Sequence, residues 1–320
     1  MAGLEDQIVG NPLNKSNLDT LINSFNSESF VPFIGAGPST VLGAAGWEKL
    51  LSDLCKSFSL AHFKKAKKDG KVDYPKTFSN LFKNLNSKGT TSQDFFEKLF
   101  NCIRPTITQA TYFHVLLVKL FDSCITTNYD HPLEKTFQDQ YGKPPAKYFF
   151  TCYGLDNLKK CIVYLHGHKD LNFCIIKEED YDYFYPSVSG KNGMPILEHF
   201  LSEVFGKKNV IFIGFSFDDK YFEDCLSRLH AIKPFANYHY WLLSESSKVF
   251  LNLKQRAEEY IRTGFPDKAT AEVSNFFHGK MNIKPIVYRE HVFVENLLQK
   301  LIESLPTATT SAALSGVPVR

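Results

Sequence analysis

The chain has 320 residues, of which 43% are hydrophobic and 22% are charged, so it is long enough for one large hydrophobic core or two modest ones. Its formal net charge of +3 is small for this length and gives no electrostatic argument for binding nucleic acid or an anionic membrane surface. The sequence has neither a run of about 18 apolar residues nor a basic start followed by an apolar segment, so we expect a cytoplasmic protein without a membrane span.

The first apolar run, at residues 30–34, is followed by Gly35 and Gly37 and then, from Trp47, by apolar residues at helical spacing. This order predicts a strand, a glycine turn and a helix. Glycine admits positive φ and close approach of the backbone, and the amide groups at the start of a helix attract phosphate. The third glycine of the dinucleotide fingerprint is missing, so an ordinary strand-to-helix turn remains an alternative.

Residues 55–121 predict a mostly helical insertion. They carry several segments with apolar residues at helical spacing, separated by polar, glycine-rich and lysine-rich connections. The lysine-rich run at residues 64–71 is interpreted as a solvated surface segment rather than a binding site, because charge runs are usually solvated.

Further apolar runs follow along the chain, and several of them end in polar residues or glycine. Runs at residues 124–126, 161–165 and 209–213 end this way, and two more lie at 238–243 and 283–288. Such runs, alternating with helical segments, predict an α/β fold with a Rossmann-like parallel sheet and helices on both faces. Ligands of such sheets bind beyond the carboxyl ends of the strands, so we expect the polar residues to gather at one edge.

The C-terminal part predicts two more helices, at residues 248–263 and 292–305. The last segment, 306–320, has low hydrophobicity and predicts a flexible tail or linker. We therefore expect one domain over residues 1–305, which contains the helical insertion at 55–121.

The seven cysteines are spread widely, and the closest two, Cys152 and Cys161, are nine positions apart. Several lie in apolar runs, where cysteine behaves as a small buried hydrophobe. The chain therefore has no CxxC pair of the kind that builds a tetrahedral zinc site, and we expect reduced thiols and no bound metal.

Asn128 and Asp130 follow the strand predicted at residues 124–126. A buried amide beside a carboxylate is costly unless each finds partners, which favours a cleft. An alternative is that Asp130 caps the helix that starts near Pro132, which would leave Asn128 unexplained.

His166 follows the apolar run at 161–165 and precedes Gly167, which suits a histidine that projects into a cleft and titrates near neutrality. A hydrogen-bonded core histidine is the alternative, and His168 is expected in a loop. Farther along, Gly214 and Ser216 are small enough to admit a ligand, and Asp218 or Asp219 is expected to cap the next helix.

Four segments occur in a definite order: a glycine turn with a serine, Thr-x-Asn-x-Asp, His-Gly, and Gly-x-Ser-x-x-Asp. In this order they resemble the sirtuin family, specifically its bacterial antiphage-defence branch of NAD-cleaving domains, such as the sirtuin domain of Thoeris-type effectors. The resemblance spans roughly residues 30–300. It implies that residues 1–305 form an NAD-binding catalytic domain, with NAD as the substrate and no metal.

The resemblance also implies roles for individual residues. Asn128 matches the asparagine that holds the attacking water or the ribose hydroxyls, Asp130 the acid that recognises the nicotinamide carboxamide, and His166 the catalytic histidine. The remaining matched positions are implied to bind NAD, with the Gly-x-Ser-x-x-Asp loop at the adenosine half: Gly35, Ala36, Gly37, Ser39, Trp47, Thr127, Gly214, Ser216 and Asp219.

The activity implied by the resemblance is that of an NAD glycohydrolase, which releases nicotinamide and ADP-ribose and depletes NAD in abortive infection. Cyclisation of ADP-ribose passes through the same oxocarbenium-like state, so these residues do not separate it from hydrolysis. An NAD-dependent deacylase or ADP-ribosyltransferase is a less favoured alternative, because the zinc module and glycine-rich substrate segment of deacylases are absent. A nucleotide-sensing or scaffold subunit of a defence complex is another. A toxic enzyme needs control, which implies a homo-oligomer, a defence partner chain or a sensor domain.

Overall fold

The computed structural model describes residues 3–9, 12–44, 46–68, 70–103, 111–152, 159–217, 219–247, 250–251 and 281–306. The helix predicted at 248–263 therefore lies outside the described residues, apart from two positions. The same holds for the tail predicted at 306–320, apart from its first residue, and for Asp218.

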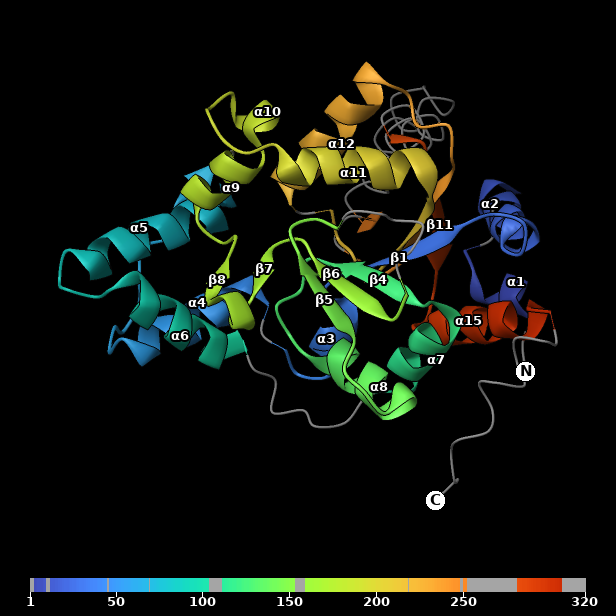
Figure 1. Cartoon of the computed structure of the whole chain (residues 1–320), viewed down its shortest axis with the longest axis horizontal. Coiled ribbons are helices and arrows are strands. Elements are labelled where there is room, and N and C mark those ends of the chain that lie inside the picture. Colours follow the sequence, from blue (N-terminus) through green and yellow to red (C-terminus); the bar gives the residue numbers. More distant parts are fainter. Residues whose placement is uncertain are drawn as a thin grey trace.

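A seven-stranded sheet forms the centre of the fold, in the order β11-β10-β9-β1-β4-β6-β5 (Figure 1). Every neighbouring pair of strands in it is parallel. This arrangement confirms the predicted Rossmann-like α/β fold. Its strands are β1 (Phe30–Ile34), β4 (Ser123–Thr126), β5 (Ala146–Phe149), β6 (Cys161–Tyr164), β9 (Asn209–Ile213), β10 (His239–Ser244) and β11 (Ile283–Tyr288).

Helices cover both faces of the sheet, because successive residues of a strand point to opposite faces and both faces are apolar. In β9, Val210 and Phe212 join the core beneath α11 (Ile196–Lys207) and α12 (Lys220–Ile232). Ile211 and Ile213 join the core of the other face. The helices on that face are α2 (Pro12–Ser24), α7 (Tyr112–Leu120), α8 (Pro132–Tyr141) and α15 (Val292–Ser304).

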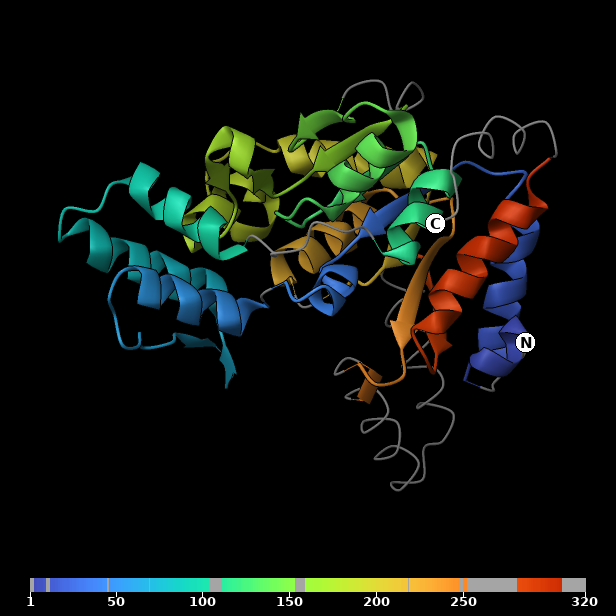
Figure 2. The same cartoon turned by 90° about the horizontal axis from the view of Figure 1, so that it is seen from below.

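A helical lobe projects from one side of the sheet, at the left of Figures 1 and 2. It contains α4 (Trp47–Ser57), α5 (Tyr74–Asn86), α6 (Ser92–Ile103) and the hairpin of β2 (Lys67–Lys68) and β3 (Lys71–Val72). Residues of these helices, such as Leu54, Phe78 and Phe95, share a separate hydrophobic core. By contrast, Leu116 and Leu117 of α7 pack with the sheet. We therefore propose that the helical insertion covers residues 46–103 rather than 55–121.

Short elements complete the described fold. They are α1 (Leu4–Gln7), α3 (Gly37–Val41), β7 (Gly167–His168), η2 (Lys169–Leu171), β8 (Phe173–Cys174), α9 (Glu178–Phe184) and α10 (Pro186–Ser189). Local signals set several helix ends. For example, α8 starts at Pro132 and stops before Gly142, whose φ of 70° ends the helix in the left-handed region.

All seven cysteines are free thiols, and six of them are buried. Among the described residues, no helix combines the length and the apolar character that a membrane crossing requires.

Candidate active site at the carboxyl edge of the sheet

The register of the central strands brings the predicted site segments to one edge of the sheet. Ile34 of β1 pairs with Thr126 of β4 and with Ile213 of β9, and Thr126 pairs with Tyr164 of β6. The segments that leave these strands therefore start at the same level. We call this the carboxyl edge, and it carries the glycine turn, Asn128, His166 and Gly214.

The loops after β1 and β9 pack backbone against backbone. The amide of Gly35 donates to the carbonyl of Ile213 at 3.0 Å, and that of Gly37 donates to the carbonyl of Gly214 at 2.9 Å. A Cβ on Gly35 would lie 2.4 Å from the Gly214 oxygen. Gly214 has a φ of +64°, and a Cβ there would lie 2.2 Å from Cδ of Pro38. These glycines are thus required for the two loops to approach each other.

Asn128 is held in place by both neighbouring loops. Its backbone amide donates to the Thr126 hydroxyl at 3.0 Å, and that hydroxyl donates to the Ile34 carbonyl at 2.8 Å. Its side-chain Nδ2 donates to the Gly35 carbonyl at 2.9 Å and lies 3.4 Å from Oγ of Ser39. Asn128 is 9% exposed and Ser39 is 2% exposed. Because the amide nitrogen is committed, the oxygen Oδ1 is the atom that Asn128 offers to a ligand.

Asp130 is half-buried next to the same serine. Burial raises the pKa of its carboxyl, and a hydrogen bond from Ser39 opposes this rise. Asp130 is not the cap of α8, because the residue in the N-cap position is His131. A small pocket of about 10 Å³, which has room for about one water molecule, lies between the segment of Asp130 and the helical lobe. It is lined by Phe100, Ile103, Tyr129, Asp130, His131 and Lys169.

His166 is almost fully buried, at 3% exposure. Its Nε2 lies 2.9 Å from the hydroxyl of Tyr185 and 3.9 Å from Oδ2 of Asp219. The ring of Tyr181 packs edge-on against it, with centroids 5.5 Å apart. Burial lowers the pKa of His166, and the charge of Asp219 opposes this shift. The imidazole is therefore neutral at pH 7 and can accept a proton.

Asp219 has two roles in the structure. Its Oδ1 accepts the amide of Phe222 at 3.1 Å, so Asp219 is the N-cap of α12. Its Oδ2 accepts the hydroxyl of Tyr181 at 3.1 Å. The sequence interpretation missed Tyr181 and Tyr185. Their spacing of four residues, which places them on one side of a helical turn, was the available signal.

The other predicted binding residues lie in different surroundings. Ala36, within the glycine turn, and Ser216, in the loop after β9, are exposed. Thr127, which follows β4, is half-buried. Trp47 belongs to the helical lobe, where its ring lies 5.8 Å from that of Tyr74 and 5.9 Å from that of Phe78. The structure thus brings most predicted positions together but places the Trp47 ring in another core.

His168 was expected in a loop, but it lies in β7 and is fully buried. His168, His131 and Glu134 form a group with the spacing of a metal site, because their ligand atoms lie within 4.8 Å of one another. Oε1 of Glu134 is 2.8 Å from Nε2 of His168 and 3.0 Å from Nδ1 of His131.

A hydrogen-bonded cluster fits these three residues better than a metal does. The Glu134 carboxylate also accepts the Tyr164 hydroxyl at 2.8 Å and the Lys147 ammonium at 3.1 Å. Nδ1 of His168 accepts the amide of Asp170, so in the neutral ring Nε2 carries the proton and cannot bind a cation. Burial alone would raise the pKa of Glu134, but hydrogen bonds from His131, His168 and Tyr164 outweigh it and hold the pKa far below its ordinary value.

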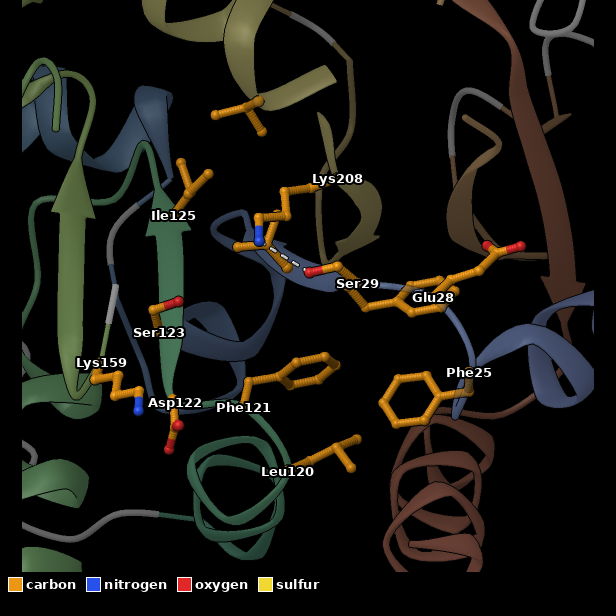
Figure 3. Close-up of a pocket in the computed structure, with 13 residues that line it drawn as sticks. Phe25, Glu28, Ser29, Leu120, Phe121, Asp122, Ser123, Ile125, Lys159 and Lys208 are labelled. Atoms are coloured by element: carbon orange, nitrogen blue, oxygen red, sulfur yellow. Dashed lines mark hydrogen bonds between the residues drawn. The ribbon is translucent and has the colours of Figure 1, made fainter. Parts of the chain in front are cut away.

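A cavity of about 350 Å³ lies at the opposite edge of the sheet, where β1, β4 and β9 begin (Figure 3). We call it the amino-end pocket. Lys208 donates to the hydroxyl of Ser29 at 2.9 Å across it. Its lining residues are Phe25, Glu28, Ser29, Phe30, Val31, Leu120, Phe121, Asp122, Ser123, Ile125, Lys159, Val204 and Lys208.

Comparison with known proteins supports the same region. Residues 122–264 match the family described as SIR2-like domain. This range includes Asn128, Asp130, His166 and the loop after β9, whereas the glycine turn precedes it. Residues 122–264 are thus similar to SIR2-like domains, and the predicted resemblance to sirtuin-like domains is confirmed.

Three relatives share the name NAD(+) hydrolase ThsA. The Bacillus cereus (strain MSX-D12) protein is 23% identical over 312 residues, which cover 96% of this chain and 61% of that protein. The Enterococcus faecium protein is 27% identical over 226 residues, covering 68% and 41%. The Acinetobacter baumannii (strain 532279) protein is 27% identical over 225 residues, covering 67% and 42%. The chain is homologous to these proteins and spans about half of their length.

Proposed function

We propose that the chain, through its SIR2-like domain, hydrolyses NAD+ at the bond between nicotinamide and ribose. The observation that carries this proposal is the position of Asn128 and Asp130, which follow β4, and of His166, which follows the neighbouring strand β6, at one edge of the parallel sheet. The name of the relatives, NAD(+) hydrolase, supports the same activity. The products are nicotinamide and ADP-ribose.

The chemistry requires positioning more than strong acid catalysis. Nicotinamide leaves with the electron pair of the glycosidic bond, and the ribose passes through an oxocarbenium-like state, as in glycoside hydrolysis. Water then forms a bond to the ribose carbon and loses a proton. In this proposal Oδ1 of Asn128 orients the water, and the neutral, buried His166 takes the proton.

We assign the nicotinamide carboxamide to Asp130, because this residue matches the acid that recognises the carboxamide in sirtuin-like domains and follows the same strand as Asn128. The phosphates and riboses are assigned to the turn formed by Gly35, Ala36, Gly37 and Ser39, together with Thr127. Gly214 and Ser216 are assigned to the adenosine half. Trp47 receives no role in NAD binding, because its ring packs on Tyr74 and Phe78.

In the cell, we propose that this activity depletes NAD during abortive infection by phage. That role rests on the resemblance to defence-associated sirtuin domains and on the relatives named NAD(+) hydrolase. An enzyme that consumes NAD in the cytoplasm must be restrained until infection. We therefore propose control through self-association, a partner chain or a sensor domain.

The test is release of nicotinamide from NAD+ by the purified chain, followed by chromatography. The wild type is compared with His166→Ala and with a matched control, His199→Ala, which alters an exposed histidine of α11. We expect release by the wild type and the control, and loss of about two orders of magnitude or more in His166→Ala. Equal rates in all three proteins would contradict the proposal, provided that thermal melting shows each of them folded.

A further inference from the structure

Three groups from two helices meet the buried His166. Tyr185 contacts Nε2 at 2.9 Å, and the carboxylate of Asp219 lies 3.9 Å from the same nitrogen. Tyr181 donates its hydroxyl to that carboxylate at 3.1 Å and packs its ring against the imidazole. Two hydrogen bonds therefore hold the Asp219 carboxylate in place, one from the Tyr181 hydroxyl to Oδ2 and one from the Phe222 amide of α12 to Oδ1.

The charge distribution around His166 is one-sided. Among the residues that the structure describes, Asp219 is the charged group beside the His166 ring. Tyr181 and Tyr185 are the other titratable neighbours of the ring. A negative charge close to Nε2 favours a proton on that nitrogen and stabilises the imidazolium. With Nε2 protonated and bound to the oxygen of Tyr185, the lone pair of the neutral ring lies on Nδ1.

We propose that Asp219 and Tyr185 are positioning residues for His166, which hold the proton on Nε2 and leave Nδ1 to accept the proton of the attacking water or a ribose hydroxyl. This inference rests on the proposed function and deepens it. In the step, the proton moves from oxygen to Nδ1, the oxygen keeps its electron pair for the bond to the ribose carbon, and Asp219 stabilises the imidazolium that forms.

The inference gives Asp219 a role different from contact with the adenosine half. The two roles predict different kinetic effects. Substitution of a residue that binds adenosine equally in the ground state and the transition state changes KM. Substitution of a residue that tunes the catalytic base changes kcat and the pH profile. If Asp219 only caps α12, a substitution that keeps the cap changes neither KM nor kcat.

The substitution Asp219→Asn separates these roles, because asparagine is as good an N-cap as aspartate and still accepts the Tyr181 hydrogen bond, but carries no charge. Tyr185→Phe removes only the hydroxyl at Nε2. Two matched controls leave His166 untouched. Tyr221→Phe removes a hydroxyl that donates to Asp182 at 3.2 Å, and Asp224→Asn removes a charge of α12 that pairs with Lys220.

The experiment has an NMR arm that needs no turnover. The protein is labelled with 15N-histidine, the His166 signals are assigned with His166→Gln, and the tautomer and pKa are read from a pH titration. We expect the Nε2–H tautomer in the wild type, a pKa lower by about one unit in Asp219→Asn, and a mixed tautomer in Tyr185→Phe. Wild-type signals from an Nδ1–H tautomer, or an unchanged pKa in Asp219→Asn, would overturn the inference.

The kinetic arm measures nicotinamide release against pH. We expect kcat to fall about tenfold or more in Asp219→Asn and Tyr185→Phe with little change in KM, and the acidic limb of the Asp219→Asn profile to move to lower pH. A rise in KM alone would overturn the inference in favour of substrate contact. An inactive wild type would count against the proposed function, and the NMR arm would then decide whether Asp219 and Tyr185 set the state of His166.

Discussion

The two edges of the sheet differ in what they bury. At the carboxyl edge, Ser39, Asn128 and His166 are buried polar side chains on segments that follow different strands, and Nδ2 of Asn128 lies 3.4 Å from Oγ of Ser39. At the amino edge, a cavity of about 350 Å³ is lined by apolar side chains together with serines and charged residues such as Lys159 and Lys208. Buried polar groups cost stability unless they are hydrogen-bonded, so their convergence calls for a functional reason. This difference supports our proposal that the reactive site lies at the carboxyl edge, where buried polar groups gather, rather than in the larger cavity.

Asn128→Ala is the variant with the largest expected effect and gives the sharpest contrast between the edges. We expect nicotinamide release to fall by about two to four orders of magnitude, because the attacking water loses the amide that orients it. The matched variant at the amino edge, Lys208→Ala, removes an ammonium from the amino-end pocket. It should leave the rate unchanged. A large loss in Lys208→Ala would move the site to the opposite edge.

Gly214→Ala tests the close contact of the two loops at the carboxyl edge. An added Cβ would clash with Pro38 at a φ of +64°, so we expect the free energy of unfolding to fall by about 3 kcal/mol or more. Gly142→Ala is the control, since Gly142 has a φ of +70° but no atom within 4 Å of an added Cβ. There the expected loss is about 1 kcal/mol. Equal losses in urea denaturation would show that the loop contact adds nothing.

Glu134→Gln tests the hydrogen-bonded cluster with His131 and His168. We expect a loss of about 1–3 kcal/mol at pH 7, because the variant leaves buried donors without a carboxylate. A carboxyl whose folded pKa is depressed contributes stability above its unfolded pKa, about 4.5 for Glu134, and loses it as pH falls toward the folded value. The difference in Tm between wild type and variant should therefore be full at neutral pH and shrink below pH 4.5. A difference that grows in acid would contradict the assignment.

The smallest effect is expected for the stability of Lys208→Ala at the amino edge. Its ammonium donates to the hydroxyl of an exposed serine, and hydrogen bonds at an exposed site contribute little, so the free energy of unfolding should change by no more than about 0.5 kcal/mol. Chemical denaturation beside the wild type measures this change. A loss as large as that of Glu134→Gln would erase the energetic distinction between the edges.

Much of the fold follows from local sequence, because the central strands are apolar on both faces. Runs such as 209–213 and 161–164 are fully buried in the structure, and their polar ends meet at the carboxyl edge as predicted. Strand β5 was missed because its residues are exposed or half-buried at the sheet margin, which leaves no continuous apolar run.

The missed site residues depend on contacts between distant segments. His168 is buried because its partner Glu134 lies on α8, and local sequence does not reveal that pairing. Tyr185 reaches His166 only because α9 folds back over the end of β6. Trp47 follows the glycine turn as expected, but Tyr74 and Phe78 draw its ring into the helical lobe. In each case the deciding partner lies more than 15 positions away.

The crystal structure of the Asn128→Ala protein with NAD+ tests the central claim most directly, because the slowed variant should retain intact substrate. The account predicts that the dinucleotide lies along the carboxyl edge, with its phosphates against residues 35–39, its nicotinamide beside Asp130 and a ribose hydroxyl within hydrogen-bonding distance of His166. NAD+ bound in the amino-end pocket, or at the carboxyl edge with its reacting ribose remote from His166, would contradict it.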